Sequence, residues 1–267
     1  MVRTIAHISD LHIGRDERTD AAAAAIRDAL VAADTGTVLF TGDVTHRGRR
    51  EELEEFERIF APVRERLIVV PGNHDRLGDD AASGLMAGAR VQVASREGLC
   101  AIRLDSTAPH NRHLVRSHGE LSPRDIEEVS DALSEAPSGA IVLLMLHHHV
   151  LPLPEDHLGE RLATLVGWPH AAELKLGRDL VGRLRGRCDL VLHGHRHRAG
   201  EIVVGAPTDR PLRVLNAGSS PELGRVRVLE HVSGRLVAER WLDVPAQERP
   251  TARADAHRRA RRAIAAA

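Results

Sequence analysis

Short apolar runs alternate with longer amphipathic segments through most of this chain. The apolar runs are rich in Val, Ile and Leu, a composition typical of strands buried on both faces of a sheet. Such strands are predicted at residues 4–9, 38–40, 67–70, 99–104, 141–146 and 189–192. Helices are predicted between them at residues 21–33, 49–60, 123–133 and 178–184. This strand–helix alternation indicates an α/β fold with a parallel sheet and right-handed crossovers.

Two of the predicted helices have recognisable starting residues. Thr19 is expected to cap the helix that opens at Ala21. Ser122 is expected to cap the helix that opens at Pro123, whose fixed φ suits the first helical position. Both side chains would satisfy backbone N–H groups that the first helical turn leaves without partners.

The alternation weakens in four other stretches. Residues 77–96 are expected to be mostly loop, and residues 151–170, rich in Pro, Gly and His, are expected to form a covering loop. Apolar and polar positions alternate at residues 212–215, 225–230 and 236–243, which predicts antiparallel strands with a turn at Ser233 and Gly234. Residues 246–267 form a polar, Arg-rich tail with a helical pattern at 252–264. We therefore expect one domain over residues 1–245, followed by the tail.

Polar side chains that can bind metal stand directly after five of the apolar runs. Each of them alone is more typical of an ordinary turn or cap. Ligands of open α/β sheets bind outside the carboxyl ends of the strands, so repetition of the pattern indicates one site at one sheet edge. The set consists of Asp10, His12, Asp43, Asn73, His74, His147, His195 and His197.

The donor atoms in this set indicate which cofactor it holds. Imidazoles, carboxylates and one amide, without a thiolate, suit borderline to hard divalent ions such as manganese, iron or zinc. Cys100 and Cys188 share no ligand or redox spacing. The set exceeds the needs of one ion, so we expect two ions, about 3.5–4 Å apart, with a carboxylate between them. Such a pair lowers the pKa of bound water and binds phosphoryl oxygens, which predicts hydrolysis of a phosphoester by metal-bound hydroxide.

The five blocks together resemble the calcineurin-like metallophosphoesterases. The resemblance implies a four-layer αββα sandwich, two divalent transition-metal ions (Mn²⁺, Fe²⁺/Fe³⁺ or Zn²⁺) and an enzyme that hydrolyses phosphoric esters. The blocks stand in the family's order, as Asp10-x-His12, Gly42-Asp43, Gly72-Asn73-His74-Asp75, His147 and Gly194-His195-x-His197.

The resemblance divides the metal ligands into two groups around Asp43, which would bridge the ions. One group is Asp10, His12 and His197, and the other is Asn73, His147 and His195. Three histidines stand in a row at residues 147–149, so the choice among His147, His148 and His149 stays open. We take the first, because it directly ends the predicted strand.

Contacts to the substrate are expected from the same loops. By the resemblance, His74 would meet the phosphate and the leaving group without binding metal. Asn73 and His149 are further candidates for contact with the substrate. Asp75 has two interpretations, since it could orient His74 or cap the turn.

Within the family, residues 8–12, 41–48 and 216–219 are most similar to the class III cyclic-nucleotide phosphodiesterases. The sequence therefore predicts a phosphodiesterase for small phosphodiesters, with cyclic nucleotides as the leading candidates. One alternative is an SbcD-like DNA-processing nuclease, and two weaker ones are a UDP-diacylglucosamine hydrolase and a metal-binding scaffold without catalysis. The Arg cluster at residues 253–262 is more typical of a solvated helix end than of a nucleic-acid contact.

Composition limits the partners and the compartment. The chain has 267 residues, 42% of them hydrophobic, which is enough to bury a core. Its formal net charge is −1, so it has no overall positive charge that would attract nucleic acid. The first residues show no apolar signal segment, and the longest apolar run, residues 140–146, is too short to span a bilayer. We expect a cytoplasmic protein with a small phosphoester substrate and no membrane partner. The oligomeric state stays open.

Overall fold

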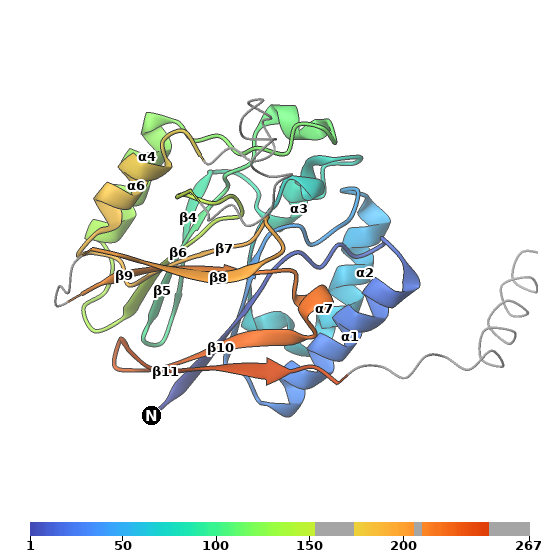
Figure 1. Cartoon of the computed structure of the whole chain (residues 1–267), viewed down its shortest axis with the longest axis horizontal. Helices are drawn as coiled ribbons and strands as arrows, with labels where there is room; N and C mark the ends of the chain where they lie inside the picture. The colour runs from blue at the N-terminus through green and yellow to red at the C-terminus, as the bar shows by residue number, and fades with distance from the viewer. Residues whose placement is uncertain (153–173, 206–209, 246–267) are drawn as a thin grey trace, which may run out of the picture.

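Two β-sheets lie face to face with helices on both outer sides (Figure 1). The computed structural model describes residues 1–152, 174–205 and 210–245. Helices α1 (Glu17–Ala32) and α2 (Arg50–Phe60) cover the first sheet, and α4 (Pro123–Ser134) and α6 (Gly177–Leu184) cover the second. The predicted four-layer αββα sandwich is therefore confirmed.

The first sheet has five strands in the order β11-β10-β1-β2-β3. Its parallel half places Ile8 beside Phe40 and Thr41 beside Val70, so three strands end at the same edge. The antiparallel half adds β10 beside β1 and β11 beside β10. The strands are β1 (Arg3–Ile8), β2 (Thr37–Thr41), β3 (Leu67–Val70), β10 (Arg225–Val232) and β11 (Arg235–Asp243).

The second sheet has six strands in the order β4-β5-β6-β7-β9-β8. Its four central strands are parallel, and an antiparallel strand closes each edge. The strands are β4 (Val91–Arg96), β5 (Leu99–Leu104), β6 (Ile141–Met145), β7 (Leu190–His193), β8 (Ala199–Val204) and β9 (Leu212–Ala217).

Three apolar layers hold the sandwich together. Ile5, Leu39 and Leu143 belong to the layer between the two sheets. Their neighbours along the strands face outward, because side chains alternate across a sheet, and pack under the helices. Phe40, for example, meets Phe56 of α2 with ring centroids 5.4 Å apart. Burial on both faces explains why these strands read as unbroken apolar runs.

The helix start predicted at Thr19 is wrong. Asp16 is the N-cap of α1, with extended backbone and a side chain that accepts a hydrogen bond from the Thr19 N–H at 2.8 Å. The first turn is polar, so the apolar periodicity begins about one turn after the helix itself. The later helix is capped by Ser122 with Pro123 in its first turn, and this prediction is confirmed.

Two edge strands were not predicted from the sequence. β4 lies in the stretch expected to be mostly loop, together with the short helix α3 (Ala82–Leu85), and β8 was not expected at all. Both are partly exposed, so they lack the apolar runs of central strands. The strand at β9 exists, but it runs parallel to β7 and antiparallel only to β8. The turn at Ser233 and Gly234 joins β10 to β11 as predicted.

Some predictions concern residues outside the described ranges. These are most of the covering loop at residues 151–170 and the Arg-rich tail at 246–267. The domain limits therefore stay a prediction. Among the described residues, no helix is both long and apolar enough to cross a membrane.

Candidate dinuclear metal site

The predicted site residues lie together where the two sheets meet at the carboxyl ends of their parallel strands. The loops after β1, β2 and β3 bring Asp10, His12, Asp43 and Asn73, and those after β6 and β7 bring His147, His195 and His197. The positions are far apart in sequence, since His12 and His197 are separated by 185 residues. The fold therefore brings together all seven residues that were predicted as metal ligands.

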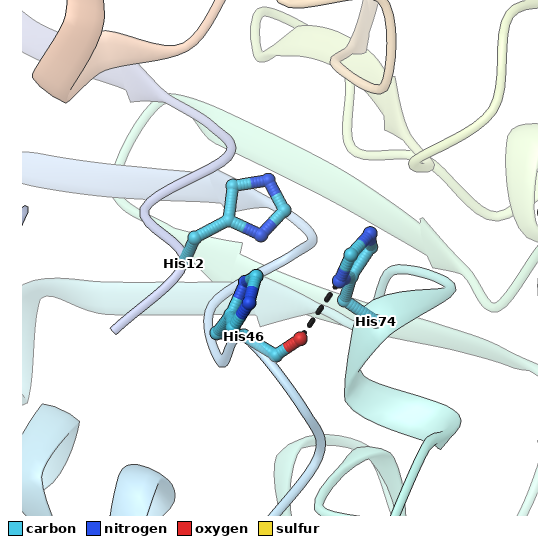
Figure 2. A group of neighbouring side chains, drawn as sticks. All are labelled: His12, His46 and His74. Carbon is cyan, nitrogen blue, oxygen red and sulfur yellow. Dashed lines mark hydrogen bonds between the residues drawn. The ribbon is translucent and has the colours of Figure 1, made fainter. Parts of the chain in front are cut away.

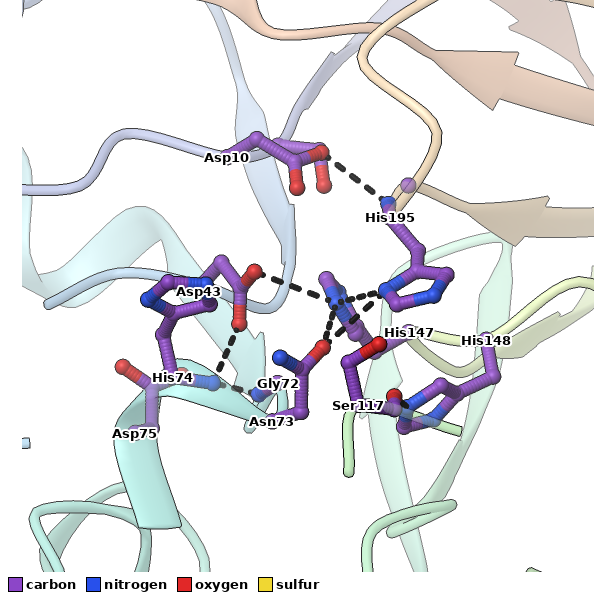
Figure 3. A network of polar contacts seen from close by, with 12 residues as sticks. Asp10, Asp43, Gly72, Asn73, His74, Asp75, Ser117, His147, His148 and His195 are labelled. Atoms are coloured by element: carbon purple, nitrogen blue, oxygen red, sulfur yellow. Dashed lines mark hydrogen bonds and ion pairs between the residues drawn. The ribbon is translucent and has the colours of Figure 1, made fainter. Parts of the chain in front are cut away.

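The first group is formed by Asp10, His12 and His197. The Nε2 atoms of His12 and His197 lie 3.1 Å apart. Asp10 Oδ1 lies 3.4 Å from His197 Nε2 and, although it is buried, accepts no hydrogen bond from the described residues. The other carboxylate oxygen of Asp10 accepts the backbone N–H of His195 at 3.1 Å, which fixes the side chain (Figure 3).

The second group is formed by Asn73, His147 and His195 (Figure 3). Asn73 Oδ1 lies 3.1 Å from His147 Nε2 and 3.0 Å from His195 Nδ1. The two imidazole nitrogens are 3.2 Å apart. One oxygen and two nitrogens therefore form a nearly equilateral triangle.

Asp43 lies between the two groups. Its Oδ2 is 3.4 Å from His147 Nε2 and 3.9 Å from His12 Nε2. Its Oδ1 accepts the backbone N–H of His74 at 2.8 Å. One carboxylate oxygen thus faces both groups while the other is held by the backbone.

These distances fit metal coordination. Ligands that each lie about 2.0–2.1 Å from one ion stand about 3.0–3.4 Å from one another, depending on the geometry. The spacings within each group lie between 3.0 and 3.4 Å. Unprotonated imidazole nitrogens that face one another repel unless a proton or a cation stands between them. The residues present therefore fit a pair of divalent ions.

The backbone at the site is unusual. Five of the seven predicted ligands have positive φ, namely Asp10 at 55°, His12 at 50°, Asp43 at 48°, His195 at 73° and His197 at 50°. Non-glycine residues rarely adopt this conformation, and such residues cluster at functional sites. The strain concentrates where the proposed ligands stand.

Steric crowding explains why the motifs have glycine at residues 72 and 194. A Cβ added to Gly72 would lie 2.2 Å from Asp43 Oδ1, and one added to Gly194 would lie 1.8 Å from Ser9 Oγ. Any side chain at these two positions would displace a carboxylate or the strand end that carries Asp10. The glycines therefore allow the ligand loops to approach one another closely.

Hydrogen bonds distinguish among the three consecutive histidines. His147 Nδ1 donates to the Thr41 carbonyl at 2.8 Å, which leaves its Nε2 facing Asp43 and Asn73. His148 uses both nitrogens elsewhere, with Ser106 Oγ and the Ser117 carbonyl. This geometry favours His147, the residue chosen from the sequence.

His149 lies against one of the predicted ligands. Its side chain is buried, and its ring stacks on that of His195 with centroids 6.1 Å apart. The structure therefore places it against a predicted ligand. A direct contact between His149 and the substrate stays a prediction, and this burial does not favour it.

His74 is held by a residue that the sequence did not single out. Its Nδ1 donates to the backbone carbonyl of His46 at 2.8 Å (Figure 2). The His46 ring stacks on it with centroids 5.7 Å apart, and the His12 ring meets it in a T-shaped arrangement with centroids 4.6 Å apart. His46 lies in the segment at residues 41–48 that was noted for its family resemblance, but nothing in the sequence assigned this residue a role of its own.

Asp75 caps the loops and does not orient His74. Its buried carboxylate accepts four hydrogen bonds: from the N–H groups of Gly72, Val44 and Thr45, and from the Thr45 hydroxyl. Burial, and after it the nearby Asp43 charge, raises the pKa of Asp75 to about 6 against the opposing effect of these bonds. The interpretation that Asp75 orients His74 is therefore wrong.

Burial and the two carboxylates shift the imidazoles in opposite directions. Burial lowers the pKa of His12 to about 4 and also lowers that of His195. Burial opposes protonation of His147 as well, but the Asp43 carboxylate outweighs it and raises the pKa to about 9. Burial likewise opposes protonation of His197, whose pKa Asp10 and Glu222 raise to about 9. Protons and divalent ions therefore compete for His147 and His197.

The end of β9 and the residues that follow it hold two of the ligand loops in place. Ser219 Oγ donates to the Asp10 carbonyl at 3.1 Å, and Ser220 Oγ accepts the Ser9 N–H at 3.3 Å. Asn216 Nδ2 donates to the Gly194 carbonyl at 3.0 Å. The sequence marked residues 216–219 only by their resemblance to the family. These contacts give the segment a structural role.

A sandwich of two mixed sheets, with carboxylates, imidazoles and an amide gathered at its edge, defines an α/β protein with a candidate site for divalent metal ions. The chain belongs to the calcineurin-like phosphoesterase family, whose sequence profile matches residues 3–199. The family inferred from the sequence motifs is thus confirmed.

Two curated relatives and one solved structure show what the chain is similar to. It is 32% identical over 215 residues to a probable cyclic nucleotide phosphodiesterase of Rhodococcus erythropolis, covering 72% of this chain and 64% of that protein. It is 29% identical over 174 residues to the 3′,5′-cyclic adenosine monophosphate phosphodiesterase CpdA of Escherichia coli K12, covering 60% and 58%. The chain thus spans less than two thirds of either relative. A dimetal phosphatase from Danio rerio shares the fold, with a TM-score of 0.59, 11% identity, and 91% and 99% coverage.

Proposed function

We propose that the protein is a phosphodiesterase that requires two divalent transition-metal ions and hydrolyses small phosphodiesters, cyclic nucleotides among them. The observation that carries this proposal is the pair of ligand groups with Asp43 between them and His74 beside them. The relatives named for cyclic-nucleotide hydrolysis support the choice of substrate.

The proposed ligands divide as the geometry groups them. Asp10, His12 and His197 would hold one ion, and Asn73, His147 and His195 would hold the other. Asp43 would contact both. When bound, such ions supply positive charge to phosphoryl oxygens and lower the pKa of bound water. The choice among manganese, iron and zinc is not fixed by these donor types.

His74 would act on the substrate itself. Because a carbonyl oxygen only accepts, the bond to His46 requires a hydrogen on His74 Nδ1 and leaves Nε2 for the substrate. A neutral ring would then present a lone pair at Nε2, and only a protonated ring could donate there. We assign to His74 the donation of a proton to the departing alkoxide, or of a hydrogen bond to a phosphoryl oxygen.

The substrate assignment is tested with a hydrolysis panel. The Mn²⁺-loaded protein is assayed with 3′,5′-cyclic AMP, bis(p-nitrophenyl) phosphate, p-nitrophenyl phosphate and single-stranded DNA. We expect the two diesters to be turned over faster than the monoester, and DNA to be a poor substrate. Salt-sensitive DNA cleavage that greatly exceeds cyclic AMP turnover would replace this proposal with the nuclease alternative.

The metal stoichiometry is tested by elemental analysis after Mn²⁺ loading and desalting. Two ions per chain are expected for the wild type. Asp43→Ala should lose both together, whereas His12→Ala should mainly weaken one, because the Asp43 carboxylate faces both groups. One ion or none in the wild type would contradict the dinuclear site.

A further inference from the structure

The two ring nitrogens of His197 point to different partners. Nε2 faces the site, 3.1 Å from His12 Nε2 and 3.4 Å from Asp10 Oδ1. Nδ1 faces away from it, 3.5 Å from Glu222 Oε2. Glu222 belongs to the short helix α7 (Ser220–Leu223), which follows β9. A carboxylate therefore lies behind the proposed ligand that comes last in the chain.

Glu222 is itself held in place. Its other oxygen accepts a hydrogen bond from Arg15 Nη1 at 3.0 Å. Arg15 is in turn tied to the site, because its backbone N–H donates to the His12 carbonyl at 3.1 Å. The start of α7 is fixed to the end of β1 by the bond from the Ser220 N–H to the Ser9 carbonyl at 3.1 Å. The loop after β1, which carries Asp10 and His12, thus contacts both Glu222 and the start of its helix.

His197 needs such a partner more than His12 and His147 do. Its side chain is 35% exposed, whereas those of His12 and His147 are 5% and 0% exposed. Close packing restrains the two buried rings, but it restrains only part of the His197 ring. The backbone of His197 is also in the left-handed region, at φ 50°. A partner for Nδ1 would restrain the half of the ring that packing leaves free.

We propose that Glu222, held by Arg15, is a positioning residue that orients His197 toward the first metal ion and sets the affinity of that ion's site. The proposal rests on the proposed function, since it assumes that His197 is a ligand. A carboxylate that accepts from Nδ1–H keeps the lone pair on Nε2 and makes that nitrogen a better ligand. Loss of such a partner typically costs about 10- to 100-fold in metal affinity or activity.

The test is a metal titration without substrate. Mn²⁺ binding is measured by calorimetry for the wild type, Glu222→Ala, Glu222→Gln and the control Glu230→Ala, whose carboxylate pairs with Arg240 on β11. We expect Glu222→Ala to weaken one of the two sites by about 10- to 100-fold. Glu222→Gln keeps an acceptor oxygen and should restore most of the affinity. Glu230→Ala should bind as the wild type does.

The outcomes separate the two proposals. If the wild type binds two ions and Glu222→Ala binds them equally well, the positioning role is wrong and the proposed function stands. If Glu222→Ala weakens both sites equally while Glu230→Ala does not, Glu222 is not specific to His197 and the inference fails. If the wild type binds fewer than two ions, the proposed function fails first. Circular dichroism of each variant confirms that the fold is retained.

Discussion

Single hydrogen bonds to the backbone set the orientation of the central histidines. His147 is turned by its bond to the Thr41 carbonyl, and His74 by its bond to the His46 carbonyl. In both cases Nδ1 must carry the hydrogen, so Nε2 is the nitrogen left for chemistry. His147 Nε2 lies near the other proposed ligands. The backbone N–H of His74 donates a hydrogen bond to the Asp43 carboxylate. The two rings thus have the same tautomer, although their proposed roles differ.

His74→Ala tests the catalytic assignment at this scale. We expect unchanged metal content and a loss of turnover of about 100- to 10,000-fold for cyclic AMP, as is typical when a general acid is removed. Bis(p-nitrophenyl) phosphate should lose much less, because nitrophenolate leaves without a proton. The measurement is kcat for both substrates together with elemental analysis.

The matched control is His46→Ala, which removes the stacked ring but keeps the backbone carbonyl that holds His74. Its effect on cyclic AMP turnover should be far smaller. If both substrates fall equally in His74→Ala with the metals in place, His74 stabilises phosphoryl charge and is not the acid. Loss of metal in that variant would make His74 a ligand.

Between elements, Asp75 joins the loop after β3 to the loop after β2. Its four hydrogen bonds hold Gly72 against Val44 and Thr45. Asp43 precedes this pair directly, and its carboxylate touches the place where a Gly72 side chain would stand. The position of the proposed bridging ligand therefore depends on a carboxylate that belongs to neither ligand group.

Asp75→Asn should separate these two loops. The amide nitrogen would face backbone N–H groups, leaving two buried donors without an acceptor, at about 1–3 kcal/mol each. We expect the free energy of unfolding to fall by about 2–6 kcal/mol in urea titrations of the metal-free protein. Both metal ions should bind more weakly, because Asp43 faces both groups.

Asp79→Asn is the control for this variant. Asp79 is exposed, and its carboxylate accepts the backbone N–H of Arg50 at 3.1 Å. A change within about 0.5 kcal/mol is typical of such surface positions. Equal stability of Asp75→Asn and the wild type would show that the four hydrogen bonds do not hold the loops together.

At the scale of the whole molecule, the site draws on both sheets. The first sheet supplies Asp10, His12, Asp43 and Asn73, and the second supplies His147, His195 and His197. Each proposed ion would thus contact residues from both sheets. The protonation of these residues should consequently influence the stability of the whole fold.

The metal-free protein should lose stability as the pH rises from 6.5 to about 8.5. His147 and His197 have a pKa of about 9 in the folded protein and the ordinary 6.5 when unfolded. The stabilisation from their protonation is complete below 6.5 and is lost as the pH rises through 9. Thermal melts in EDTA should give a lower Tm at pH 8.5 than at pH 6.5.

Loading with Mn²⁺ should remove this decline. The two nitrogens would then bind metal in place of protons, and metal affinity itself should increase with pH, since binding releases those protons. A Tm of the EDTA-treated protein that stays constant or rises over the same range would show that His147 and His197 are not protonated in the fold.

The sequence by itself determined the central strands and the residues predicted as metal ligands, which the fold brings together. Central strands are buried on both faces, so they appear as apolar runs, and a parallel sheet places the residues after each run at one edge. Asp10, Asp43 and Asn73 could therefore be located without coordinates. The close approach of the loops leaves a local trace as well, in glycines such as Gly72 and Gly194.

Only the tertiary structure decided the features that depend on contacts between distant loops. It showed which nitrogens of residues 147–149 face Asp43, and it brought Glu222 behind His197. It also gave Asp75 its four partners. Side chains of this kind are ordinary polar residues in the sequence, because a hydrogen bond depends on the position of two atoms and not on a repeating pattern. The edge strands β4 and β8 were missed for another reason, because they are partly exposed and therefore lack apolar runs.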